Sequence, residues 1–193
     1  MKKIGVLAQQ GAFVEHIALL RRLEVEAFPV RLAGELEGLD GLIIPGGESS
    51  SIGKLMQEYE LAEPVRRLGK QGFPIMGTCA GMILLAKRAS GLNLEPLGVM
   101  NIEVKRNAFG RQVDSFETDL EIPAIGEPPF HAVFIRAPCI EKVGDGVEIL
   151  ARLPNGIGVA ARQGNIVALA FHPELTSDLR LHRYFLDIVG NGR

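Results

Sequence analysis

A cysteine between two glycines is the most chemically suggestive feature of the sequence. Cys79 is the central residue of Gly77-Thr78-Cys79-Ala80-Gly81, after a short apolar run and before apolar residues at helical spacing. A glycine-x-nucleophile-x-glycine run between a strand and a helix is typical of a nucleophile elbow, whose tight turn projects the central side chain. Larger side chains would clash at the glycine positions. The pattern predicts a cysteine nucleophile at a helix N-terminus, which favours the thiolate and leaves the Ala80 N–H free for an oxyanion.

A cysteine nucleophile also needs a base and a group that orients the base. The segment His172-Pro173-Glu174 follows an apolar run that is typical of a strand. Proline disfavours the helical conformation of the residue before it, and residues two apart in an extended segment point to the same side. Glu174 can therefore bind one imidazole nitrogen of His172 while the other faces Cys79. These three side chains predict a Cys–His–Glu triad.

A purely structural role for the same residues stays open. A lone free cysteine is commonly a small buried hydrophobe, and the histidine and glutamate could be a strand end and a helix cap. The other cysteine, Cys139, is expected to be buried or partly exposed. The other histidines are expected to be surface or structural residues; they are His16, His131 and His182. The combination of elbow and His-Pro-Glu favours the triad.

A second glycine-rich loop follows another apolar run. It reads Pro45-Gly46-Gly47-Glu48-Ser49. Adjacent glycines allow backbone N–H groups to approach a ligand closely, so Gly47 could provide a second oxyanion donor. A plain structural turn is the alternative.

The composition limits the class of protein. The chain has 193 residues, 47% of them hydrophobic, and a formal net charge of -2, which predicts one domain over residues 1–193. Near-neutral charge gives no reason to expect nucleic acid or an anionic membrane as partner. No apolar run is long enough to cross a bilayer, and polar residues interrupt the N-terminal one. Two cysteines are too few for a disulfide framework in a chain of this size. We therefore expect the protein to be located in the reducing cytoplasm.

The elements that must position these residues differ between the two halves. In the first half we expect strands at residues 4–8, 25–30, 39–44 and 74–77, and helices near 13–20, 52–59, 64–69 and 80–88. Serines 49–51 are expected to cap the second helix. Alternation of this kind predicts an α/β fold, a mostly parallel central sheet with helices on both faces.

The second half is dominated by strands. They are expected at residues 99–105, 112–122, 132–136, 147–152, 156–161 and 166–171. Turn signals separate them, so we expect antiparallel strands added to one edge of the parallel sheet or packed beside it. A last helix has Leu181, Phe185 and Ile188 on one face. Nothing indicates a domain boundary.

The elbow, the glycine-rich loop and His-Pro-Glu together resemble class I (triad) glutamine amidotransferases. Residues 10–16 (QGAFVEH), 106–116 (RNAFGRQVDSF) and 134–138 (FIRAP) narrow the resemblance to the PdxT/SNO family, the glutaminase subunit of pyridoxal 5′-phosphate synthase. The resemblance covers essentially the whole chain. Ser50 and Ser51, where relatives often have threonines, are a small departure.

The resemblance implies a three-layer sandwich fold and a cysteine thioester mechanism. Cys79 attacks the glutamine side-chain amide, and the N–H groups of Gly47 and Ala80 hold the oxyanion. His172, oriented by Glu174, protonates the departing ammonia, and water releases glutamate. No metal or cofactor is implied. The residues implied to contact L-glutamine are Gly47, Glu48, Ser49, Arg106, Ile135 and Arg136.

The resemblance also implies a partner. Ammonia would pass to a separate (β/α)₈-barrel synthase subunit, with Gln10, Glu15 and His16 facing it and little glutaminase activity in its absence. Three alternatives stay open. They are the glutaminase subunit of another amidotransferase, such as imidazole glycerol phosphate synthase, a cysteine peptidase or stress protein with a similar elbow, and a non-catalytic binding subunit.

Overall fold

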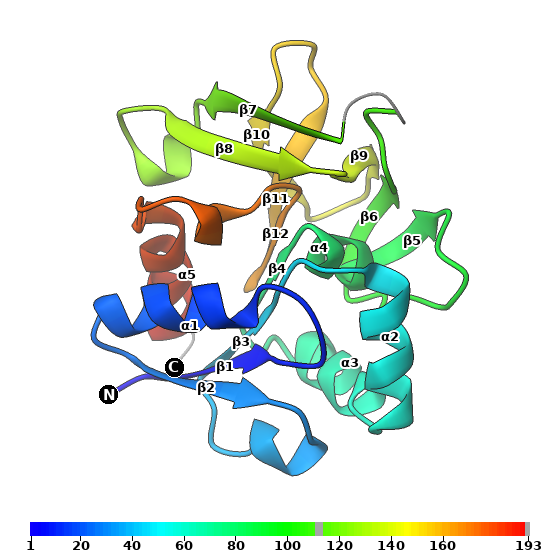
Figure 1. Ribbon diagram of the computed structural model, residues 1–193, viewed down its shortest axis with the longest axis vertical. Coiled ribbons are helices and arrows are strands. Elements are labelled where there is room, and N and C mark those ends of the chain that lie inside the picture. The colour runs from blue at the N-terminus through cyan, green and yellow to red at the C-terminus, as the bar shows by residue number, and fades with distance from the viewer. Residues whose placement is uncertain (111–113, 192–193) are drawn as a thin grey trace.

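The computed structural model describes residues 1–110 and 114–191 (Figure 1). Within these residues a 10-stranded mixed sheet forms the centre of the molecule, beside a 2-stranded antiparallel ribbon. Residues 111–113 lie outside the described part, so the predicted motif positions Arg111 and Gln112 are not placed. No described helix is long and apolar enough to cross a membrane.

The parallel part of the sheet has the strand order β2-β1-β3-β4-β12. Its strands are β1 (Lys3–Leu7), β2 (Glu26–Val30), β3 (Gly41–Ile44), β4 (Ile75–Thr78) and β12 (Ile166–Leu169). The first four confirm the strands predicted in the first half. Every residue of β3, β4 and β12 is buried. Burial of this kind is expected where helices cover both faces of a parallel sheet.

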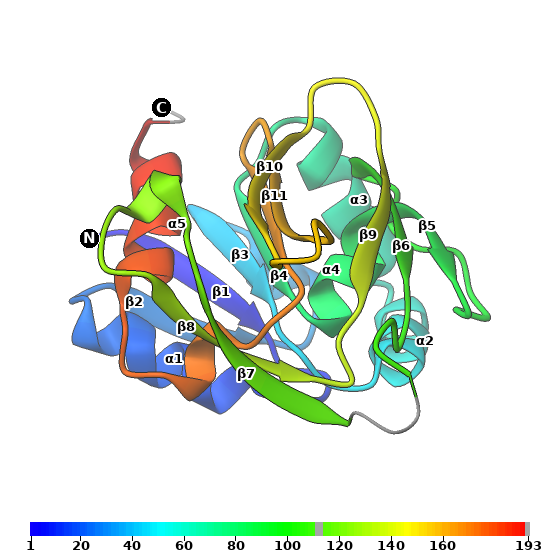
Figure 2. The same cartoon turned by 90° about the horizontal axis from the view of Figure 1, so that it is seen from above.

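Helices cover both faces of the sheet, as predicted. They are α1 (Phe13–Arg22), α2 (Ser49–Glu58), α3 (Ala62–Lys70), α4 (Ala80–Leu85) and α5 (Arg180–Asn191). The chain crosses from β1 to β2 in one direction and from β3 to β4 in the other. Because such crossovers are right-handed, α1 and the α2–α3 pair must lie on opposite faces. Figure 2 shows α1 and α5 on one side and α2, α3 and α4 on the other. The three-layer arrangement is therefore confirmed.

The second half adds mostly antiparallel strands. Beyond β12 the sheet continues with β11 (Gly158–Gln163), β9 (Cys139–Val143), β6 (Met100–Lys105) and β5 (Ala86–Ser90), while β10 (Glu148–Arg152) pairs with β11. The separate ribbon consists of β7 (Ser115–Leu120) and β8 (Phe130–Ile135). Short 3-10 turns complete the chain: η1 (Ala33–Leu36), η2 (Pro123–Ile125) and η3 (Pro173–Leu175).

Two strand directions differ from the prediction. We expected the strands of the second half to be antiparallel, but β12 pairs parallel with β4 and β5 pairs parallel with β6. The pattern of apolar residues shows which residues are buried but not which way a strand runs. The strand β9 was not predicted, because its apolar residues are followed by a charged pair. The strand expected at 112–122 corresponds to the shorter β7.

Two helix boundaries also differ from the prediction. The helix expected over 80–88 ends at Leu85, and residues 86–90 form β5 instead. The backbone N–H of Leu97 donates to Leu84 and that of Val99 to Leu85, so a distant segment takes the last carbonyls of the helix. The second helix begins at the serines themselves, and Glu48 is its N-cap. Its carboxylate has two oxygens for the free N–H groups, which a single serine hydroxyl cannot match.

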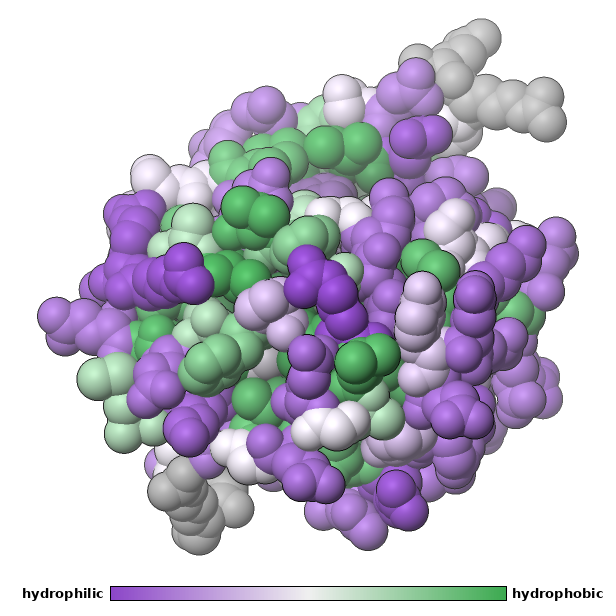
Figure 3. All heavy atoms as spheres, turned by 60° about the horizontal axis from the view of Figure 1, so that its bottom comes forward, coloured by the Kyte–Doolittle hydropathy of each residue, from purple (hydrophilic) through white to green (hydrophobic). Residues whose placement is uncertain are grey.

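The core extends from the sheet to both helical layers. The last helix buries Leu181, Phe185 and Ile188, which confirms its predicted apolar face. On the face drawn in Figure 3, hydrophobic residues form small patches among hydrophilic ones.

Candidate active site

The elbow predicted around Cys79 has the expected geometry. The strand β4 ends just before Cys79 and α4 begins just after it, while Cys79 itself has φ 50° and ψ −102°. A Cβ on Gly77 would lie 2.6 Å from the backbone of Gly81, and a Cβ on Gly81 would overlap the carbonyl oxygen of Ile44. The Cys79 N–H donates to the Leu169 carbonyl of β12 over 2.8 Å. Both glycines are thus sterically required, and the elbow is tied to the next strand.

His172 and Glu174 lie beside the elbow. The Nδ1 atom of His172 is 2.6 Å from Oε1 of Glu174, and both residues are buried. The N–H of His172 donates to the Val133 carbonyl of β8 over 2.9 Å. Burial lowers the pKa of His172, but hydrogen bonds with Cys79 and Glu174 outweigh it and raise that pKa to about 10. The structure therefore brings the three predicted triad side chains together, with an imidazole that holds a proton at neutral pH.

A pocket of about 300 Å³ opens beside Cys79. All six residues predicted to contact glutamine line it, together with the catalytic candidates Cys79 and His172 and three residues that were not predicted to lie there, Gln10, Ile83 and Asn107. The lining residues are Gln10, Gly47, Glu48, Ser49, Cys79, Ile83, Arg106, Asn107, Ile135, Arg136 and His172. Asn107 and Arg136 have φ of 47° and 41°, in the left-handed region that non-glycine residues seldom adopt. Backbone strain of this kind concentrates at functional sites.

Hydrogen bonds and an ion pair of Glu48 hold the part of the pocket wall that the start of α2 forms. The carboxylate of Glu48 accepts from the N–H groups of Ser50 and Ser51 over 3.1 and 2.6 Å and is 3.0 Å from the Arg106 guanidinium. Partial burial would raise the pKa of Glu48, but these hydrogen bonds and the charge of Arg106 lower it. The buried hydroxyl of Ser49 has no partner among the described residues. It is a polar group that a bound ligand can satisfy.

The two predicted oxyanion donors lie in the two loops next to the pocket: Gly47 lines it beside Cys79, and Ala80 directly follows Cys79 in the chain. Ala80 occupies the first position of α4, where no helical carbonyl can reach its N–H. The segment before α1 holds the Gly47 loop, because Gln10 accepts from the N–H of Glu48 over 2.8 Å. The role of these donors stays a prediction.

The partner-facing prediction is wrong for one residue. Gln10 and Glu15 are exposed, but His16 is fully buried and cannot touch a partner. Its imidazole lies between α1 and α5, 2.9 Å from that of His182. A signal was available, since His16 stands four residues before the buried Leu20 on the same helical face.

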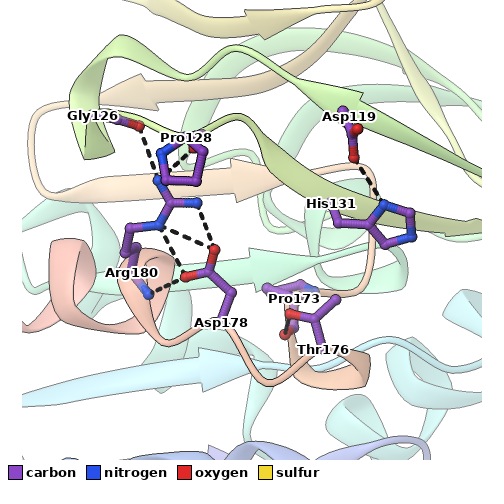
Figure 4. A network of polar contacts seen from close by, with 8 residues as sticks. All are labelled: Asp119, Gly126, Pro128, His131, Pro173, Thr176, Asp178 and Arg180. Carbon is purple, nitrogen blue, oxygen red and sulfur yellow. Dashed lines mark hydrogen bonds and ion pairs between the residues drawn. The ribbon is translucent and has the colours of Figure 1, made fainter.

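An ion pair that sequence reasoning missed fixes the segment after η3. Arg180 binds Asp178 over 2.6 Å and donates to the carbonyls of Gly126 and Pro128 over 3.0 and 2.6 Å (Figure 4). The hydrogen bond from Arg180 lowers the pKa of Asp178. The cluster joins the start of α5 to the loop before β8, the strand whose carbonyl holds His172.

Comparisons with known proteins agree with one another. A family model described as the SNO glutamine amidotransferase family matches residues 6–191. Proteins named pyridoxal 5′-phosphate synthase subunit PdxT from Moorella thermoacetica and Pelotomaculum thermopropionicum are 61% and 58% identical to the chain. These matches cover 97% and 96% of the chain and 100% and 94% of the relatives.

Solved structures give the same result. One described as a crystal structure of glutamine amidotransferase superposes with a TM-score of 0.91 at 53% identity and covers 97% of this chain and 98% of its own. The structure of PurLQS from Thermotoga maritima superposes with a TM-score of 0.74 at 16% identity over 96% of this chain and 98% of that one. The second likeness shows the fold alone.

Proposed function

The chain belongs to the SNO glutamine amidotransferase family, and we propose that it is the glutaminase subunit of a pyridoxal 5′-phosphate synthase. It hydrolyses L-glutamine to L-glutamate and ammonia. The ammonia is delivered to a separate synthase subunit. Among the alternatives raised by the sequence, none is favoured by the comparisons or by the site.

The proposed reaction begins when the Cys79 thiolate attacks the side-chain amide carbon of glutamine. The N–H groups of Gly47 and Ala80 stabilise the tetrahedral oxyanion. As this intermediate collapses, the carbon–nitrogen bond breaks and His172 gives its proton to the departing nitrogen, which leaves as ammonia. The product is a glutamyl thioester on the cysteine sulfur.

Water completes the cycle. His172, now neutral, takes a proton from a water molecule that attacks the thioester carbonyl. The second tetrahedral intermediate expels the Cys79 thiolate and releases glutamate. Glu174 keeps the imidazole oriented through both steps and stabilises its charged form. General acid–base help of this kind contributes about 10²–10⁴-fold to a rate.

The observation that carries the proposal is the convergence of the triad on a pocket that the predicted glutamine contacts line. The pocket has two guanidinium groups for the substrate α-carboxylate. Arg106 is paired with Glu48, whereas Arg136 is exposed and forms no ion pair with any described residue. The unpartnered Ser49 hydroxyl adds a hydrogen-bonding group for the substrate.

The partner is inferred to be the barrel subunit that the resemblance implies. Gln10 and Glu15 are exposed, and Gln10 contacts the pocket loop directly. A protein docked on this segment can therefore alter the oxyanion loop. Cys79 and Cys139 are both unpaired, which suits the reducing cytoplasm in which we expect the enzyme to act.

The proposal is tested by measuring ammonia release from glutamine, with and without the synthase subunit. We expect Cys79→Ala to abolish the activity while the variant stays folded. Cys139→Ala is the matched control, because that thiol is also buried but lies on β9 outside the pocket. Wild-type turnover in Cys79→Ala would remove the nucleophile assignment. Equal activity with and without the synthase subunit would instead indicate a stand-alone amidase.

A further inference from the structure

Two buried histidines continue the line of the triad into the protein. His16 on α1 and His182 on α5 are both 0% exposed. The Nε2 atom of His16 lies 3.4 Å from Oε2 of Glu174, the carboxylate oxygen that His172 does not use. The same nitrogen is 3.2 Å from the hydroxyl of Thr78. The other nitrogen of His16, Nδ1, is 2.9 Å from Nε2 of His182.

Hydrogen-bond accounting selects one arrangement of protons in this line. Of the two nitrogens that face each other at 2.9 Å, one must donate. If His16 Nδ1 donated, its Nε2 lone pair could accept from the Thr78 hydroxyl but would also face the Glu174 carboxylate, and the remaining N–H of His182 would be buried without an acceptor among the described residues. If His182 Nε2 donates instead, His16 Nε2–H faces both the Thr78 hydroxyl at 3.2 Å and the Glu174 carboxylate at 3.4 Å, and the unpaired atom on His182 is a lone pair. The second arrangement avoids both penalties.

Neutral imidazoles suit this arrangement. Burial, followed by the neighbouring charges of His182 and His172, lowers the pKa of His16 well below its ordinary value. Burial lowers the pKa of His182 to about 4. The titratable groups that face His16 are Glu174, His172 and His182. Near neutral pH each of the two inner histidines therefore has one N–H to give.

We propose that His16 is a positioning residue for the triad, whose Nε2–H, directed by His182, is the second donor to the Glu174 carboxylate. Oε2 of Glu174 is buried and makes no hydrogen bond with any described residue, and His16 Nε2 lies within ion-pair distance of it at 3.4 Å. A buried polar oxygen that is left without a hydrogen-bond donor costs free energy. The distance of 3.4 Å is long for a hydrogen bond, and such contacts often tighten only when substrate binds. The inference rests on the proposed glutaminase function.

The activity test compares two substitutions of His16 in the complex with the synthase subunit. We expect His16→Leu to lower kcat for glutamine hydrolysis by about 10–100-fold, as for other partners of a catalytic group, with little change in KM. His16→Gln keeps an N–H donor at similar reach and should recover most of that loss. His131→Gln is the matched control, since that histidine is exposed on β8. Equal losses in the Leu and Gln variants, or no loss in either, would overturn the proposal.

A measurement on the wild-type chain decides the case if the substitutions prevent folding. Nitrogen-15 labelling of the four histidines, followed by NMR of the ring nitrogens, identifies each tautomer. We expect His16 and His182 to be neutral and protonated at Nε2 between about pH 6 and 8. A proton on Nδ1 of His16 would refute the arrangement. This readout needs no turnover, so its failure is distinct from failure of the proposed function, which the ammonia assay reports.

Discussion

Replacing Gly46 by alanine tests whether the His172 imidazole must lie where the structure places it. A Cβ on Gly46 would lie 3.0 Å from Nδ1 of His172, closer still to its Cε1, and 3.4 Å from Cβ of Cys79. Ordinary contacts begin at 3.4 Å and extend to 4 Å. The ring must therefore move by roughly 1 Å, away from the position in which it interacts with Cys79 and Glu174.

The expected cost follows from that displacement. A misplacement of about 1 Å in a catalytic group lowers kcat by about 10²-fold, which is about 3 kcal/mol in the activation barrier. The backbone of Gly46 is not in the left-handed region, so alanine introduces no backbone strain there. Overpacking should cost about 1–3 kcal/mol of stability. The loss of activity should thus exceed what partial unfolding explains.

The assay is glutamate release by the complex with the synthase subunit, together with urea unfolding of each variant. Gly34→Ala is the matched control, because a Cβ at that position of η1 meets nothing within 4 Å. We expect the control to keep wild-type kcat. A folded Gly46→Ala variant with wild-type kcat would refute the placement of the His172 ring.

Three further predictions concern the charged groups of the site. His172→Asn should lower kcat by about 10²–10⁴-fold, and turnover within tenfold of wild type would exclude His172 as the acid–base group. Because folding raises the pKa of His172 from 6.5 to about 10, its stabilising contribution is complete below pH 6.5 and is lost as pH rises through 10. The free energy of unfolding in urea should therefore fall more steeply over this range in wild type than in His172→Asn, and parallel curves would contradict the raised pKa. Arg106→Met should raise KM for glutamine about 10–100-fold. Arg88→Met is the control, because Arg88 is exposed and lies outside the pocket, and it should leave KM unchanged. Equal KM values for the two variants would count against Arg106 as a substrate contact.

The parts of the site that could be predicted from the sequence are those decided by local sterics. The elbow depends on residues within two positions of Cys79, and Gly77 is required by its contact with Gly81 in the same turn, whereas Gly81 is required by the Ile44 carbonyl of the neighbouring strand β3. His172 and Glu174 are also close in sequence, but their 2.6 Å contact forms across the start of the 3-10 turn η3 and not along the extended segment that was predicted. Short-range patterns of this kind are visible in a single sequence.

The parts that could not be predicted depend on distant segments. The helix α4 ends at Leu85 because N–H groups of residues 97–99 take its last carbonyls, which no feature of residues 80–88 reveals. The burial of His16 depends on α5, more than 160 residues further along the chain, which places His182 against it. Arg180 likewise joins loops that only the tertiary fold brings together.

The wrong direction predicted for β12 shows why the site nevertheless assembles. The triad requires that the residue after β12 lie beside the residue after β4. In a parallel pair the carboxyl ends meet at one edge, and Leu169 of β12 is paired with Thr78 of β4. An antiparallel β12 would have carried His172 to the opposite edge of the sheet, far from Cys79. The loops after β1, β3, β4 and β12 provide Gln10, the Gly46–Gly47 turn, the nucleophile and the histidine from one edge. The predicted convergence of these groups at one edge therefore favours a parallel pairing of β12 with β4, although most strands of the second half are antiparallel.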